Sequence, residues 1–426
     1  MSLINLLVRH EGHDEEPSEP MHEHSGAVYV DYKLTGMMVF HFILVAIAFG
    51  FVLPYGFVCK QARSRWHLIV QLVGGVSAIM AAITGHVTGI EWYNPWLVDF
   101  CALWGLACVG GTLLLQIYMP RGILSAMREI VNKVHTAISL LQPLVCFVFA
   151  GLAFISYLQY CKSDHLGQCL AHGIMGTAFI VYGVILLCML FIGEHFLKRM
   201  NRSQEYFDSM VIMIWGIINT FTEHRWGKED WNHGDVQHTS MGIIWWAAGA
   251  LGVYMSWDRV NHRPQRNHIP AFVIIATGYS MITHTQRFAV STDIHMMFGV
   301  VLVLAGLTRI VEISFVLKDQ PHEGNEVKSF QYLTPLLLCL SGCFFMSATE
   351  EAMAFLHSQG VMAAPYLLTI SAVGFVLFLD AYFMVTSYKQ LSQGIELPTK
   401  EAGIELRPFL HQPDEEAQVN DFEISD

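Results

Sequence analysis

Long apolar segments separated by short polar ones dominate the chain. A transmembrane helix needs about 20 mainly apolar residues to cross a hydrocarbon core of about 30 Å. Eleven segments meet this requirement: 35–58, 66–89, 97–118, 135–157, 170–193, 206–223, 239–257, 269–286, 294–317, 331–349 and 365–387. We therefore predict an all-α, polytopic membrane protein with about 11 transmembrane helices. The sixth and eighth segments are short, which predicts that they are tilted or embedded.

Composition agrees with this pattern and excludes two classes of protein. Of the 426 residues, 53% are apolar and only 14% are charged, so the chain is not a soluble enzyme. The formal net charge of −12 comes mainly from an acidic, His-containing arm (1–34) and an acidic tail (391–426), and it implies no nucleic-acid partner. The partner expected from composition is the lipid bilayer.

The distribution of Lys and Arg predicts the orientation, because cytosolic loops are enriched in these residues. With Arg309 set aside as lying within a span, the segments on one side hold 17 Lys and Arg residues and those on the other side hold 6. This places the N-terminus outside the cytosol and the C-terminus in it. It also places Cys161 and Cys169, which flank one short loop, where a disulfide is stable.

Three apolar segments begin with the same spacing of histidine and glycine. On an α-helix, offsets of 4 and 11 residues fall on one face, so each segment carries a His-Gly-Gly stripe. The three stripes are His172-x3-Gly176-x6-Gly183, His238-x3-Gly242-x6-Gly249 and His295-x3-Gly299-x6-Gly306. We interpret them as copies of a two-helix unit whose glycines allow the helices to approach closely.

With this topology, many ionisable residues gather near the expected extracytoplasmic face. Such residues at the ends of spans are costly and usually face a cavity or a partner. Imidazoles suit Zn, Cu and Fe, while carboxylates widen the choice and can carry protons. The candidate metal ligands are His172, Glu223, His224, His238, His284, His295, Glu350 and Glu351. Two alternatives remain open: the stripes are packing seams alone, or the groups form a proton-linked conduit.

The N-terminal half resembles the core of ascorbate-reducible, two-haem transmembrane cytochromes b. The resemblance rests on His41-x2-Leu44-x3-Ala48-x5-Pro54-x-Gly56, on Trp66-His67-x3-Gln71, and on His135 at the start of a later helix. It implies haem b held between His67 and His135 near the inner face. Asp99, Cys101 and Gly105 stand where the family has a further axial histidine, so an outer haem would use His41 and His86 instead. The competing interpretation is that these histidines are polar groups satisfied between helices.

The chain as a whole resembles the fungal Ytp-type multi-spanning membrane proteins through NTFTEHRWG…DVQHTSMGI and FGVVLVLAGLTRIVEI. This resemblance implies a cytochrome-b-like membrane domain (35–134) followed by a longer repeat-built membrane domain (135–390). It supplies no reaction.

We expect a membrane redox or metal-handling protein. Electrons or metal ions would be exchanged between the N-terminal haem site and the His and Glu residues near the extracytoplasmic face, and the expected partners are metal ions or a small electron donor. The alternatives are a proton-linked transporter without haem and a structural membrane protein. Arg309 and Glu312, one helical turn apart, are expected to form a charge-compensating trio with Asp380.

Overall fold

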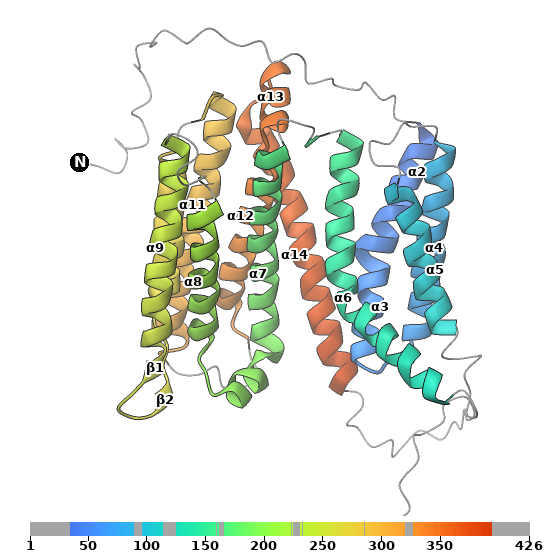
Figure 1. The fold of residues 1–426 in the computed structure, drawn as a ribbon, viewed down its shortest axis with the longest axis horizontal. Coiled ribbons are helices and arrows are strands. Elements are labelled where there is room, and N and C mark those ends of the chain that lie inside the picture. The colour runs from blue at the N-terminus through green and yellow to red at the C-terminus, as the bar shows by residue number, and fades with distance from the viewer. Residues whose placement is uncertain are drawn as a thin grey trace, which may run out of the picture.

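The protein is a bundle of helices that runs almost without interruption through the described part of the chain (Figure 1). In this computed structural model the described residues are 35–88, 96–113, 125–158, 160–161, 166–222, 224, 231, 233–284, 286–319 and 327–393. The acidic arm and nearly all of the acidic tail lie outside these ranges.

The first five helical elements and α6 form an N-terminal group. They are α2 (Gly36–Val45), the π-helical stretch η1 (Ala46–Val52), α3 (Leu53–Gln61), α4 (His67–Val87), α5 (Trp96–Leu113) and α6 (Ser125–Leu158). The first three form one rod, Gly36–Gln61. Pro54 lacks an N–H and its ring crowds the carbonyl four residues earlier, which explains the widened turns before it. The rod continues through Pro54 and Gly56 rather than ending there.

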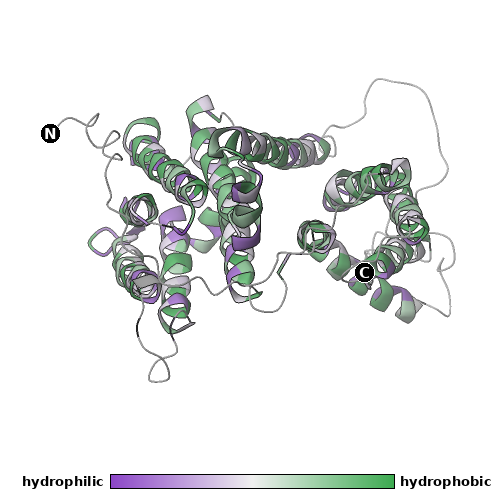
Figure 2. Ribbon diagram, turned by 90° about the horizontal axis from the view of Figure 1, so that it is seen from above, coloured by the Kyte–Doolittle hydropathy of each residue, from purple (hydrophilic) through white to green (hydrophobic). Residues whose placement is uncertain are grey.

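The remaining elements form a C-terminal group, separate from the first when viewed from above (Figure 2). They are α7 (Leu166–Met200), α8 (Gln204–Thr222), α9 (His233–Met255), α10 (Ile269–Ile282), α11 (Ala289–Val311) with η4 (Glu312–Val316), η5 (Ser329–Tyr332), α12 (Leu333–Ser347), α13 (Glu350–Ser358) and α14 (Ala363–Gln393). A two-stranded hairpin, β1 (Trp257–Asp258) and β2 (Arg263–Pro264), joins α9 to α10. The sequence pattern did not predict this hairpin. We call its end of the bundle the hairpin side and the opposite end the α13 side.

Each His-Gly-Gly stripe packs against one partner helix, and it does so in the same register. A Cβ added at the first glycine of the stripe would lie within 3.0 Å of a backbone nitrogen on the partner, four residues after a partner glycine. The three glycine pairs are Gly176 with Gly342, Gly242 with Gly216, and Gly299 with Gly278. The stripes are therefore packing seams, and each seam sets the depth of the histidine one turn away.

These seams define three helix pairs: α8 with α9, α10 with α11, and α12 with α7. In the first two pairs the partner helix precedes the stripe helix in sequence. In the third pair the stripe helix α7 comes first and the partner α12 comes last. The third pair thus joins the two ends of the repeat predicted from the sequence.

Helix α14 links the two groups, because it packs against α7 and α12 on one side and α3 on the other. The rings of Tyr55 and Phe383 lie 5.4 Å apart at this junction. The predicted domain boundary at 134/135 falls inside α6, a single helix that packs on α3 and α5.

All eleven predicted spans coincide with helices, which confirms the all-α membrane fold. Among the described residues, eight helices are long and apolar enough to cross a membrane. Helix α10 is shorter, at 14 residues, and α8 and α9 are not among the eight. The count of eleven is therefore not confirmed. Large apolar side chains point outward, for example Leu368 at 73% exposure, as expected for a surface in contact with lipid.

Candidate functional site

Four imidazoles gather on the α13 side of the C-terminal group, three from the helices α7, α9 and α11 and one from just after the end of α10. Their ring centroids lie 5.9 Å apart for His172 and His295, 6.2 Å for His295 and His284, and 6.1 Å for His284 and His238. His238 is also close enough to interact electrostatically with His172 and His295. We call these four residues the His cluster. The cluster joins all three stripes, as the sequence predicted.

Two of these histidines are held by their own helices. The Nδ1 atom of His172 lies 2.9 Å from the carbonyl oxygen of Gln168, and that of His295 lies 2.8 Å from the carbonyl oxygen of Ser291. A carbonyl only accepts hydrogen bonds, so Nδ1 carries the proton in both rings and Nε2 presents a lone pair. The Nε2 atom of His172 is buried without a hydrogen-bond partner. The Phe345 ring stacks on His172 at 4.6 Å and fixes its plane.

A glutamine orients the third ring. The amide nitrogen of Gln237 donates to the carbonyl oxygen of Ser280 at 3.0 Å, so its amide oxygen faces His284 and accepts a hydrogen bond from Nδ1. His284 therefore also presents an Nε2 lone pair. Partners that fix the tautomer in this way are typical of histidines that bind metal ions. Sequence reasoning missed Gln237, which lies one residue before a stripe histidine.

The cluster is wider than a formed metal site. Zn–N distances of about 2.0–2.1 Å in a tetrahedral site place neighbouring ring centroids roughly 5 Å apart, and the observed separations are about 1 Å longer. Accordingly, no three His, Cys, Asp or Glu side chains of the described residues already stand at metal-binding distances. The nitrogens reach such distances only if the helix ends close slightly.

The other predicted ligands on this side have different partners. His224 is buried, lies 3.1 Å from Asp235 and stacks on Trp231 at 3.7 Å. Glu351 accepts a hydrogen bond from the backbone N–H of Cys161 at 2.8 Å, next to the disulfide that joins Cys161 to Cys169. The predicted pairing of these cysteines is confirmed. Glu351 thus anchors the start of α13.

Two of the predicted ligands remain to be placed. Glu350 lies in the first turn of α13, where its backbone N–H donates to the Gln168 side chain. This contact ties α13 to the helix that carries His172. Glu223 lies outside the described residues.

In the N-terminal group the inner pair of histidines meets. The Nε2 atoms of His67 and His135 lie 3.4 Å apart, and the Nδ1 of His67 lies 2.9 Å from the carbonyl oxygen of Gly56. The outer pair has separate partners: Nδ1 of buried His41 lies 2.8 Å from the carbonyl oxygen of Ala81. The exposed His86 lies 3.1 Å from Asp99. Of the two predicted pairs, only the inner one brings its two imidazoles together.

An ionic network lies on the hairpin side and differs from the predicted trio. Arg309 forms ion pairs of 2.8 Å with both Glu312 and Glu205, and Arg266 lies 2.7 Å from Glu205. Asp380, the expected third member, is not part of these pairs. Glu205 and Arg266 were missed because they lie in segments interpreted as polar loops. The network holds α8, α11 and the loop after the hairpin together.

Two family models match separate parts of the chain. Residues 145–389 match the family described as "Protein YTP1-like, C-terminal", and residues 21–95 match a domain of unknown function, DUF2427. No solved structure matches the chain.

Three yeast relatives cover much of the chain. Protein YTP1 of Saccharomyces cerevisiae is 35% identical over 86% of this chain and 81% of its own length. The membrane protein C3B8.06 of Schizosaccharomyces pombe is 25% identical, over 53% of this chain and 52% of its own length. The S. cerevisiae membrane protein YCR061W is 25% identical, over 57% and 46%. The chain belongs to the Ytp1-like family of multi-pass membrane proteins.

Proposed function

We propose that this chain is a metal-handling membrane protein that binds a transition-metal ion with the His cluster. The single observation that carries the proposal is the convergence of four imidazoles from α7, α9, the end of α10 and α11. Helix packing at the glycines does not by itself require a histidine four residues before the first glycine of each stripe. The seams instead bring His172, His238 and His295 to one depth, and His284, just after α10, joins them.

The protonation pattern supports a cation rather than an anion. In His172, His284 and His295 the Nδ1 atoms face carbonyl or amide oxygens, so the Nε2 lone pairs remain for a ligand. Buried polar atoms without a partner are costly, and a metal ion would satisfy the Nε2 of His172. The cluster contains no carboxylate, which favours Zn, Cu or Fe over Mg or Ca.

The proposal is tested by measuring the metal content of the purified full-length chain. The arm histidines His10, His13, His22 and His24 are first replaced by Ala, so that only metal bound elsewhere is counted. We expect about one Zn or Cu ion per chain, lost on His295→Ala. The matched control is His268→Ala, which removes a partly buried imidazole bonded to Ser314 on the hairpin side.

Either of two results contradicts the proposal. One is a chain that stays free of metal after equilibration with micromolar Zn and Cu. The other is equal loss of metal from both variants. A metal-free chain would instead favour the hypothesis that the protein is a proton-linked transporter that uses the same histidines.

A second candidate function, electron transfer through haem, is favoured by the geometry of His67 and His135. Two imidazoles on opposite sides of one metal ion, each at about 2.0–2.1 Å, have their nitrogens about 4 Å apart. The observed Nε2 separation is 3.4 Å, a hydrogen bond between the two rings, so the rings would have to move apart by about 0.6 Å to hold one ion between them. The bond from the His67 Nδ1 to the Gly56 carbonyl leaves the Nε2 of His67 as the ligating atom in such an arrangement. A bound haem would supply a one-electron couple here.

The absorbance spectrum of the full-length chain tests this second function. We expect a Soret band that shifts on reduction and is abolished by His67→Ala or His135→Ala. The same substitution at the exposed His86 should leave the band unchanged. A correctly inserted chain without a Soret band, after expression with sufficient haem, would rule out the haem.

A further inference from the structure

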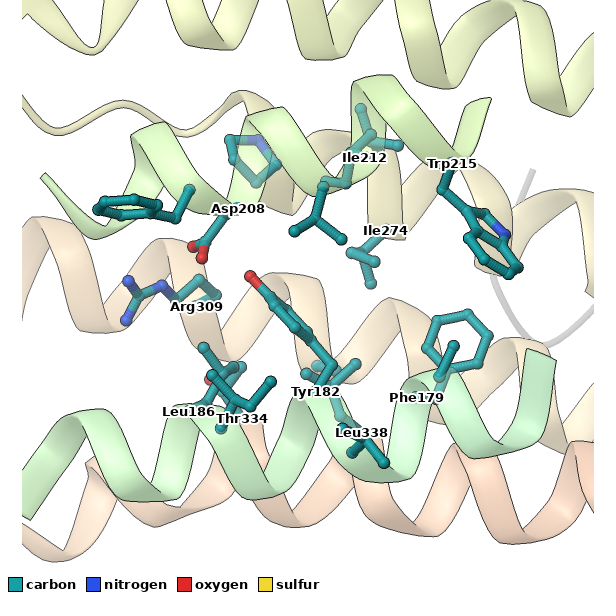
Figure 3. A pocket seen from close by; sticks show the side chains of 18 of the residues that line it. Phe179, Tyr182, Leu186, Asp208, Ile212, Trp215, Ile274, Arg309, Thr334 and Leu338 are labelled. Atoms are coloured by element: carbon teal, nitrogen blue, oxygen red, sulfur yellow. The ribbon is translucent and has the colours of Figure 1, made fainter. Parts of the chain in front are cut away.

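A large cavity lies in the C-terminal group, apart from the His cluster. Its volume is about 680 Å³, within the range of about 300–1,000 Å³ typical of small-molecule sites. Helices α7, α8, α10, α11 and α12 supply most of its wall, and no member of the His cluster lines it (Figure 3). The cavity is therefore a candidate binding site separate from the His cluster.

The wall is almost entirely apolar, with one polar place. There the Tyr182 hydroxyl points towards the Asp208 carboxyl, beside Arg309 (Figure 3). Both groups are buried and lie close enough to interact with each other. A ligand with a hydrogen-bonding atom at this place would therefore meet a donor and an acceptor side by side.

Arg309 is not free to bind an anionic ligand. Its guanidinium already pairs with Glu205 and Glu312 at 2.8 Å each. Asp208 stands on the same side and would repel a phosphate or carboxylate. The polar place therefore suits a neutral oxygen, which can accept a hydrogen bond from Tyr182 or donate one to Asp208.

The cavity opens sideways between α7 and α8. These helices follow each other in sequence, but their backbones hardly touch. Side chains bridge them at two levels, where Trp215 donates to the Met175 sulfur at 3.1 Å and where the rings of Phe196 and Phe207 lie 5.2 Å apart.

Several lining residues are themselves exposed on the outside of the bundle, including Ile185 at 47% and Val211 at 52%. Ile185 lies on α7, a helix long and apolar enough to cross a membrane. The exposed apolar side chains around the mouth therefore suit the hydrocarbon of the bilayer rather than water. A ligand that enters here comes from the membrane rather than from water.

We propose that this cavity binds a neutral membrane lipid with one hydroxyl or carbonyl head group and a large hydrocarbon body. The head group lies at Tyr182 and Asp208, and the body lies along the apolar wall near Phe179 and Trp215. Sterols and isoprenoid quinones share this chemistry. The cavity and its mouth carry the inference, which does not depend on metal or haem.

The experiment uses the full-length chain in detergent and two photoreactive probes, one a sterol and one a quinone with an isoprenoid tail. We expect at least one probe to label peptides of α7 or α8, with competition by the unlabelled lipid. Labelling by the sterol alone or the quinone alone identifies the source, and labelling by both supports the shared chemistry. Labelling by neither overturns the proposal.

Matched variants locate the site. Ala178→Trp, an exposed position that lines the cavity, should reduce labelling at least tenfold, whereas Ala247→Trp on the outer face of α9 should not. Tyr182→Phe, which removes only the hydroxyl, should weaken binding by roughly 2- to 10-fold. Tyr279→Phe, at an exposed tyrosine, should have no effect. Unchanged labelling in Ala178→Trp, with the variant eluting as a single species, contradicts the proposal.

Discussion

Replacing Gly299 by Ala should weaken metal binding although it removes no ligand. The added Cβ would lie 2.4 Å from the carbonyl oxygen of Gly278 and 2.8 Å from the backbone nitrogen of Ile282, up to about 1.0 Å short of ordinary contact at 3.4 Å. Backbone cannot move aside as a flexible side chain can, so α10 and α11 must separate by roughly that amount. Overpacking of this kind costs about 1–3 kcal/mol of stability.

The effect reaches the His cluster because Gly299 is one turn from His295, while His284 lies two residues after the end of the opposing helix. Metal sites tolerate shifts of only about 0.2 Å in ligand distance, so a separation of up to about 1.0 Å is large. We expect the metal dissociation constant to rise by about 10- to 100-fold, as it does when partners that orient a metal ligand are lost. The assay is competition of the purified chain against a chromogenic Zn chelator.

The control is Gly306→Ala, which creates a milder backbone clash on the same pair of helices, 2.8 Å from the Ala271 carbonyl oxygen. This position lies roughly 16 Å along the helix from His295. Both variants should lower the melting temperature, but only Gly299→Ala should change the metal affinity strongly. Equal affinities in the two variants would refute the reasoning that the seam positions the histidine.

Three further predictions concern charge, pH and orientation. Arg309→Gln should destabilise the chain by about 3–5 kcal/mol, because it leaves the buried Glu312 without an ion-pair partner and Glu205 with Arg266 alone; a melting temperature unchanged in detergent would contradict this. Burial, and secondarily the neighbouring His238, lowers the pKa of His284 from 6.5. Since only neutral imidazole binds metal, affinity should hold as the pH falls to about 6.5 and decline only below it. A glycosylation acceptor in 226–237 should be modified and one in 258–268 should not, and the reverse pattern would invert the predicted orientation.

The helices could be predicted from the sequence because apolar segments of membrane length have few alternatives to helix. The three His-Gly-Gly stripes likewise predicted that His172, His238 and His295 would share one depth. Nothing in the stripes identified their partner helices. Gly216, Gly278 and Gly342 are single glycines in apolar segments, and only the packing shows that they face the stripes.

Long-range contacts explain most of what the sequence could not predict. The pairing of α7 with α12 joins segments that lie at opposite ends of the repeat region, and no local pattern encodes it. Similarly, Glu205 and Arg266 reach Arg309 from different elements, so a search by helical spacing found only Glu312. Asp208 could be recognised from the sequence as a carboxylate inside a predicted span. Its place beside Tyr182 in the wall of the cavity could not, because that depends on the packing of α7 against α8 and their neighbours.

The most direct test of the central claim is X-ray absorption at the metal edge of the full-length chain, with the four arm histidines replaced by Ala. If His172, His238, His284 and His295 bind one ion together, the first shell should consist of three or four imidazole nitrogens at about 2.0–2.1 Å. The signal should lose one imidazole in His284→Ala. A shell dominated by oxygen or sulfur, or one unchanged when these histidines are replaced, would contradict the account.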